Sequence, residues 1–222
     1  MKSQDIVLLL KLVSLERWEK GFRKGVRSDH LWESPMNAWQ DWDVEEPFRL
    51  DIQSEEINNE AVERAIIERY SVRGLADATG ISKSQVSLVL RRSEEVGLCR
   101  PDRTIPVPRC NTKALFEFIV YGLKYVFSAR LGEVTRGIAT SFGAPVLEEQ
   151  LMSAGELVPV WPDAKGRTRG AAVTPLYKSV PYAVRRDPYL YALLALTDAI
   201  RLGASREHQL AAGKLESMLR DF

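Results

Sequence analysis

One segment of the chain has the spacing of two helices joined by a tight turn: Leu75-Ala-Asp-Ala-Thr-Gly80-Ile-Ser-Lys-Ser-Gln-Val-Ser-Leu-Val-Leu90. Its spacing runs from a small residue, Ala76, through three residues to Gly80, and then through five more to Val86. A small side chain at Ala76 lets a second helix cross closely, and glycine supplies the positive φ of a tight turn between helices. Ile81, Val86 and Val89 then fall on the inner face of the second helix, which leaves a polar outer face.

The two helices are expected over residues 72–79 and about 82–96. The pattern resembles the helix-turn-helix of LacI-type and MarR-type bacterial transcriptional regulators, because the residues from Gly80 to Leu90 are similar to their turn and recognition helix. The resemblance covers residues 71–98 and implies binding to double-stranded DNA, with the second helix in the major groove. A helical hairpin of an enzyme, or a winged helix that binds protein, is the alternative interpretation.

The resemblance also implies roles for single residues of the second helix. Ser82 would cap this helix, and the bases would be contacted from its N-terminal end by Lys83, Ser84, Gln85 and Ser87. Gln85 can pair with adenine through two hydrogen bonds, whereas the serines accept several base edges. Farther along, Arg91 and Arg92 are expected to neutralise phosphates. Leu88 departs from the pattern, and we expect it to contact a thymine methyl group or to pack against a wing.

A two-stranded wing is predicted after Gly97, which is placed like the residue that follows a helix end. The strands would be Leu98-Cys-Arg and Thr104-Ile-Pro-Val, joined over Pro101-Asp-Arg. Arg100, Arg103 and Arg109 would then lie on the surface. Arg103, at the tip, is the candidate for a phosphate or minor-groove contact, unless the wing is only a solvated loop.

The net charge of +1 conceals an asymmetry along the chain. Residues 29–63 hold eleven acidic side chains and one arginine, whereas residues 69–113 hold nine basic and four acidic ones. Phosphates repel the acidic segment, so it must face away from DNA. We expect either an insertion whose tryptophan side chains pack against the core, or an arm that binds a second protein through Trp32, Trp39 and Trp42.

The remaining sequence predicts a mainly α fold: a winged helix-turn-helix with a small β wing, followed by a helical region that carries a small β hairpin. Residues 1–110 would form the DNA-binding domain, with the acidic aromatic insertion at about 21–56, and residues 111–222 a helical dimerisation or effector domain. Helical periodicity predicts an amphipathic helix over 3–20, capped by Ser3, and further helices over 57–70, 111–127, 188–202 and 205–221. Asn111 and Asp187 are expected to cap two of these helices. The helix over 111–127 is apolar on most faces, so we expect it to be covered nearly all round. The hairpin is expected around 161–166.

Two cysteines, Cys99 and Cys110, and two histidines are too few and too scattered for a zinc site. The sequence contains no arrangement of a nucleophile and a general base that would indicate catalysis. We therefore expect that the protein is not an enzyme and that it binds neither a metal ion nor a cofactor. The apolar runs contain charged residues or lie beside them, and they are too short to span a bilayer. The N-terminal apolar run also lacks the features of a secretory signal. These features predict a cytoplasmic protein with no membrane contact.

Three hypotheses follow from the sequence. The first is a sequence-specific regulator that binds double-stranded DNA, as a homodimeric repressor. The second is an antitoxin-type autorepressor whose acidic segment binds a partner protein. The third is a repressor that senses a ligand or a thiol oxidant through Cys99 and Cys110, which could meet across the wing.

Overall fold

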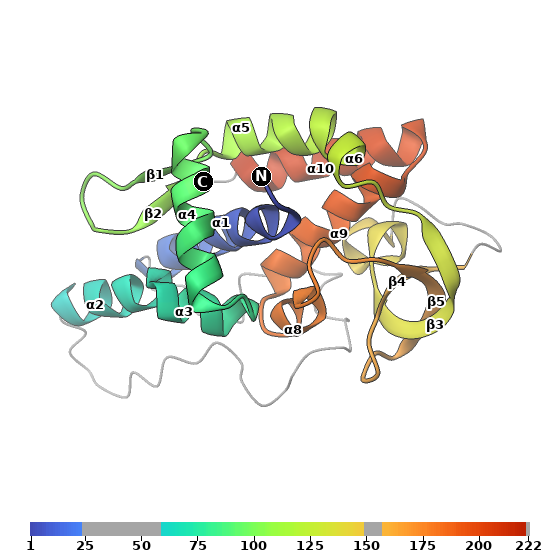
Figure 1. Cartoon of the computed structure of the whole chain (residues 1–222), viewed down its shortest axis with the longest axis horizontal. Coiled ribbons are helices and arrows are strands. Elements are labelled where there is room, and N and C mark those ends of the chain that lie inside the picture. Colours follow the sequence, from blue (N-terminus) through green and yellow to red (C-terminus); the bar gives the residue numbers. More distant parts are fainter. Residues whose placement is uncertain (24–58, 149–156, 221–222) are drawn as a thin grey trace.

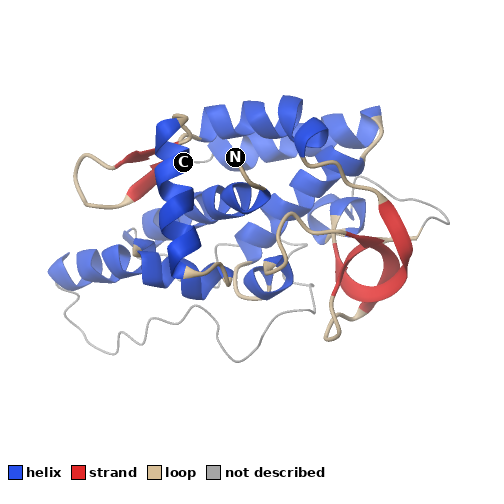
Figure 2. Cartoon of the chain, viewed as in Figure 1, coloured by secondary structure: helices blue, strands red, loops and turns tan. Residues whose placement is uncertain are grey.

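The computed structural model describes residues 1–23, 59–148 and 157–220, and these residues are mainly helical (Figures 1 and 2). The helices are α1 (Ser3–Arg23), α2 (Asn59–Tyr70), α3 (Val72–Thr79), α4 (Lys83–Glu95), α5 (Thr112–Glu117), α6 (Leu123–Val126), α7 (Pro145–Glu148), α8 (Val180–Val184), α9 (Pro188–Leu202) and α10 (Ser205–Arg220), with a π-helical turn η3 (Phe118–Gly122) and a 3-10 turn η4 (Ser141–Gly143). The strands are β1 (Cys99–Pro101), β2 (Pro108–Cys110), β3 (Leu131–Ala139), β4 (Pro159–Pro162) and β5 (Thr168–Val173). The prediction of a mainly α fold is confirmed.

Helix α1 passes through the middle of the molecule and contacts α2, α3, α4, β2 and α9 (Figure 1). The sequence predicts an amphipathic helix, but the structure buries α1 on nearly all sides from Gln4 to Leu15. Polar side chains can be buried on α1 because each of them has a hydrogen-bond or ion-pair partner on another part of the chain. The predicted cap is also wrong: Ser3 is the first helical residue, and the Asp5 carboxylate accepts the backbone N–H of Lys2 at 2.8 Å.

The short hairpin β1–β2 follows α4, with Cys99 opposite Cys110. The sequence places its second strand at 104–107, whereas the structure places it at Pro108–Cys110. The difference arises in the loop, where the Asp102 carboxylate accepts the backbone N–H groups of Thr104 and Ile105. Those hydrogen bonds curl the chain, and Ile105 is buried in the core instead of continuing a strand.

Asn111 caps the helix after the hairpin β1–β2, as predicted, and accepts the N–H of Ala114. The helix runs as α5, the π turn η3 and α6. The sequence predicts that its apolar sides are covered nearly all round. In the structure, however, Tyr121 and Tyr125 are 70% and 76% exposed, and Val126 is exposed beside them.

Strands β3, β4 and β5 close into a three-stranded barrel. The sequence predicts a hairpin at 161–166 and misses β3. In the structure, β3 pairs antiparallel with both other strands, while β4 and β5 run parallel. Glycine makes so small a barrel possible: a Cβ on Gly137 would lie 2.0 Å from the Trp161 carbonyl oxygen, and one on Gly170 would lie 1.8 Å from that of Val158.

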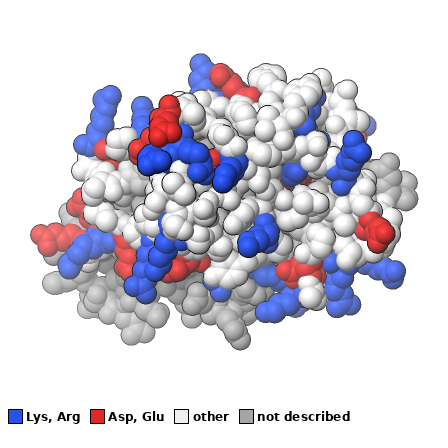
Figure 3. Space-filling view, viewed as in Figure 1, with Lys and Arg blue, Asp and Glu red and all other residues white. Residues whose placement is uncertain are grey.

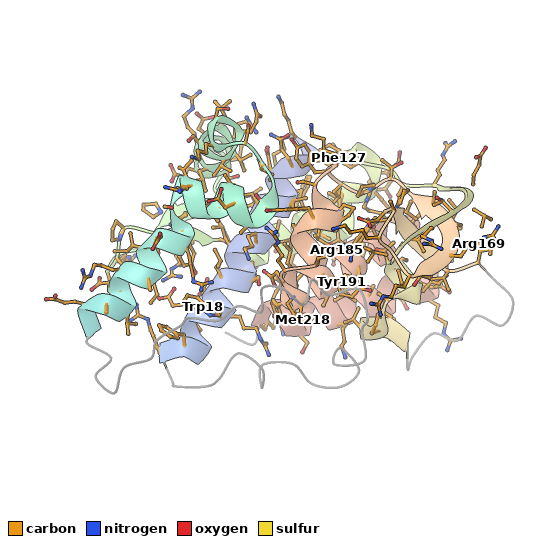
Figure 4. All side chains as sticks on the ribbon, turned by 90° about the horizontal axis from the view of Figure 1, so that it is seen from below. Trp18, Phe127, Arg169, Arg185, Tyr191 and Met218 are labelled. Atoms are coloured by element: carbon orange, nitrogen blue, oxygen red, sulfur yellow. The ribbon has the colours of Figure 1, made fainter. Side chains whose placement is uncertain are left out.

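Helix α9 anchors the barrel. Its Asp198 carboxylate accepts hydrogen bonds from Trp161 Nε1 (2.6 Å) and Thr140 Oγ1 (3.1 Å) and pairs with Arg201. The Tyr191 hydroxyl donates to the Ala139 carbonyl at 2.8 Å, and Figure 4 shows Tyr191 beside the barrel. The hydrophobic core is continuous from α1 through α4 to α9 and α10. One core therefore contains residues from both sides of the domain boundary expected at residue 110. No helix in the described ranges is long and apolar enough to cross a membrane.

Candidate nucleic-acid interface

The candidate interface is built on the helix pair α3–α4. Ser71 caps α3 by accepting the N–H of Gly74, and Gly80 ends it with φ +66° and donates its N–H to the Ala76 carbonyl at 2.8 Å. The positive φ of Gly80 agrees with the turn predicted from the sequence, whereas the Ser71 cap was not predicted. The inner face of α4 is buried through Val86 and Val89, as predicted.

Helix α4 presents the opposite face to solvent. Lys83, Ser84 and Ser87 are exposed over its first two turns, and Leu88 is 38% exposed beside them. None of the exposed side chains in these two turns is acidic. Ser82 occupies the N-cap position, but its hydroxyl makes no capping hydrogen bond. It lies 3.4 Å from the hydroxyl of Ser84 instead, so the cap predicted for this side chain is absent.

Gln85 is turned toward the N-terminus of α1. Its Oε1 accepts a hydrogen bond of 2.7 Å from Nε2 of Gln4, a residue that is itself buried. Pairing with adenine requires both the oxygen and the nitrogen of the amide. The contact with Gln4 therefore makes Gln85 a link between α1 and α4.

The two arginines of α4 differ in their surroundings. Arg91 is exposed and lies 3.6 Å from the exposed Glu95 one turn later, which is a weak contact in water. Arg92 donates to both carboxylate oxygens of Asp5, at 2.6 and 3.2 Å, and Asp5 is fully buried. Arg92 is therefore held by α1. The expected phosphate contact from this position does not agree with the geometry.

The hairpin β1–β2 leaves Arg100 and Arg103 exposed, as the sequence predicts. Arg109 is different. Its guanidinium donates to Glu19 (2.6 and 3.1 Å), to Asp102 (2.7 Å) and to the hydroxyl of Tyr70 (2.8 Å). These contacts fix the hairpin to α1 and α2, and they correct the expectation that Arg109 lies on the surface.

Acidic partners of Arg109 are stabilised in their charged form. Burial raises the pKa of Glu19, but the hydrogen bonds and charges of Arg109 and Arg23 lower it to below its ordinary value. The pKa of Asp102 is lowered further, by hydrogen bonds from Thr104 and Arg109. The basic and acidic groups at the root of the hairpin thus neutralise one another, and the exposed arginines alone give the hairpin its charge.

Cys99 and Cys110 face each other in the register of the hairpin and are both buried free thiols. Burial raises the pKa of Cys99 to about 11 and raises that of Cys110 even more. A thiolate is the reactive form of cysteine, so burial makes both groups inert near neutral pH.

Sequence reasoning missed a contact between this site and the C-terminal half of the chain. Ser179 Oγ donates to the Thr79 carbonyl at 2.6 Å, and the hydroxyl of Tyr182 donates to the Asp77 carbonyl at 3.0 Å. Helix α8 therefore covers the C-terminal end of α3. No spacing in the sequence joins these residues, which lie about a hundred positions apart.

On the face that carries α4, Figure 3 shows Lys and Arg side chains over α4 and toward the barrel, with Asp and Glu side chains among them. Trp32, Trp39 and Trp42 lie outside the described residues. Within the described part of the chain, no group of three or more His, Cys, Asp or Glu side chains is arranged to hold a metal ion.

Comparisons with protein-family models, with curated proteins and with solved structures find no match to this chain. Its function must therefore be argued from its own residues and contacts.

Proposed function

We propose that this chain is a regulator that binds double-stranded DNA in a sequence-specific way. The pair α3–α4 acts as a helix-turn-helix, with α4 as the recognition helix and β1–β2 as the wing. One observation carries the proposal: α4 buries its inner face while its first two turns expose only small polar and basic side chains and Leu88. A helix with such a face fits the major groove, where hydroxyl and ammonium groups meet base edges.

In this proposal, the tasks are divided among the residues as follows. Lys83, Ser84 and Ser87 contact the bases, and Leu88 contacts a thymine methyl group. Arg91, Arg100 and Arg103 contact phosphates. Arg92 and Gln85 position α4 against α1 and make at most secondary contacts with DNA.

The chain acts as a homodimer in this proposal, because one recognition helix reads too few base pairs for a specific site. Tyr121, Tyr125 and Val126 on η3 and α6 give the exposed apolar area that a second copy would cover. Light scattering with the variant Tyr121→Ser/Tyr125→Ser tests this step: the variant should be monomeric where the unaltered chain is dimeric.

A random pool of duplexes tests DNA binding. The unaltered chain should enrich a short motif with two half-sites, and Ser84→Ala/Ser87→Ala should change the enriched bases while leaving the fold intact. Arg91→Ala should weaken binding to all duplexes alike. Failure to retain any duplex at low salt would overturn the proposal and favour a surface that binds protein.

The two alternatives have less support. A thiol-sensing repressor needs a reactive cysteine, and both thiols are buried with raised pKa values. The antitoxin-type hypothesis depends on Trp32, Trp39 and Trp42, and no contact in the described ranges favours it.

A further inference from the structure

The segment that contains α8 lies directly against the turn between α3 and α4. Besides the hydrogen bonds to the Thr79 and Asp77 carbonyls, the packing is tight: a Cβ on Gly80 would lie 2.9 Å from the Cβ of Ser179 and 3.1 Å from the ring of Tyr182. Gly80 precedes the first residue of α4 by three positions. The segment is therefore adjacent to the end of α4 that would enter the groove, as Figure 1 shows for α8 and the lower end of α4.

This segment is basic on its exposed side. Lys178 is exposed, and the guanidinium of Arg186 lies 4.2 Å from the ring centre of Tyr182 and donates to its hydroxyl. Arg185 is buried and pairs with Asp163 at 2.8 Å.

Among the described residues, Asp187 and Asp77 are acidic groups beside this segment, and each has another cation as its partner. Asp187, next to Arg186 in the chain, is buried, forms an ion pair with Lys11 and accepts a hydrogen bond from Ser14. Asp77 is exposed on α3 and lies 3.8 Å from Arg73. Among the described residues, no ion pair joins the exposed Lys178 or the half-buried Arg186 to a carboxylate, so both positive charges remain beside the turn that leads into α4.

We propose that Lys178 and Arg186 form a second contact with DNA, on the phosphates that flank the groove occupied by α4. The inference rests on the proposed function and extends it to a part of the chain outside the helix-turn-helix. Arginine and lysine beside a recognition helix fix its position on the duplex without reading bases. Tyr182 is a positioning residue, because its hydroxyl joins Arg186 to the backbone of α3.

The salt dependence of binding tests the proposal. Each lost phosphate contact lowers the slope of log affinity against log salt by about 0.9, so Lys178→Ala/Arg186→Ala should lower it by about 1.8. The loss of affinity between 50 and 200 mM salt would then be about twelvefold smaller than for the unaltered chain. The enriched DNA motif should not change.

The matched control removes two exposed cations from α10, in Arg206→Ala/Lys214→Ala, and should keep the original slope. Tyr182→Phe keeps every charge but removes the hydroxyl that holds Arg186, and we expect part of the slope to be lost. A double variant at Lys178 and Arg186 that binds a selected duplex with the slope of the α10 control would overturn this inference alone. A chain that binds no duplex would instead overturn the proposed function.

Discussion

Lys11 and Asp187 form a buried ion pair across 176 positions of the chain, with 2.7 Å between Nζ and Oδ2. Ser14 donates to the same carboxylate, which also caps α9 by accepting the N–H of Leu190 at 2.9 Å. The sequence predicts only the cap. The pair fixes α1, the helix that supports α4 and the hairpin β1–β2, to the C-terminal half of the molecule.

Replacing Lys11 by Met should destabilise the protein strongly, because it leaves the Asp187 carboxylate buried without its cation. Removal of one partner of a buried pair costs about 3–5 kcal/mol. Urea unfolding measures the change. The double variant Lys11→Met/Asp187→Asn removes both charges and should recover part of the loss. Equal stability of Lys11→Met and the unaltered chain would show that the pair is not formed.

Arg91 and Arg92 are neighbours in the sequence and should behave in opposite ways. Arg92→Ala leaves Asp5 buried without its guanidinium, and we expect a loss of about 1–2 kcal/mol of stability. Arg91→Ala should leave stability unchanged but weaken DNA binding. Thermal unfolding and a DNA-binding titration on the same two variants separate the effects, and a reversed pattern would contradict the assignment.

Gly80 and Gly97 both have positive φ, at +66° and +74°, but only Gly80 is crowded. Replacement of either by Ala adds strain of about 1 kcal/mol from the left-handed backbone. Gly80→Ala must in addition push away Ser179, so its loss should be clearly larger. Gly97→Ala, with nothing within 4 Å of the added Cβ, is the control. Similar losses for both variants would mean that α8 does not press on the turn.

The attachment of the hairpin β1–β2 to α1 should weaken in acid. The pKa of Glu19 is lowered in the folded chain, so its contribution to stability is present above its ordinary value near 4.5 and is lost as pH falls through the lower folded value. Asp102 adds to the effect in the same direction. Urea midpoints between pH 7 and 3 should fall, and the fall should be smaller in Glu19→Gln. If the urea midpoint of Glu19→Gln falls with pH as steeply as that of the unaltered chain, the role of the Arg109–Glu19 pair is contradicted.

The two cysteines should be unreactive at neutral pH. With its pKa raised to about 11, Cys99 carries almost no thiolate at pH 7.5, and the more deeply buried Cys110 carries less. A thiol reagent should label the folded chain far more slowly than the unfolded chain. Hydrogen peroxide should leave DNA binding unchanged, whereas release of DNA by oxidant would favour the thiol-sensing hypothesis.

The local structure around Gly80 could be predicted because its causes are local. Ala76, Gly80, Val86 and Val89 have the spacing of two helices and a tight turn, and the turn requires a backbone that glycine adopts most easily. The caps at Asn111 and Asp187 follow from the same reasoning, since each bonds an N–H three residues away. Each of these features depends on side chains that are close in the sequence.

The barrel could not be predicted in this way. Strand β3 is exposed at its start and buried at its end, so it shows no regular alternation. Its two partners follow it only after Pro159, and the close approach of their backbones depends on glycines whose purpose appears only when the strands meet. No feature of the sequence between β4 and β5 indicates that these two strands pair in parallel.

The sequence alone determined the helix pair, its turn and the polar face of α4, because periodicity and φ preference act over a few residues. Only the tertiary structure decided which polar residues face outward. Arg92 and Arg109 carry the same side chain as the exposed Arg91 and Arg103, and Gln85 is polar like the exposed Ser84. Gln85, Arg92 and Arg109 are nevertheless turned inward to Gln4, Asp5 and Glu19 on α1. A buried charge needs a partner, and those partners lie more than eighty positions away, beyond the reach of any local pattern.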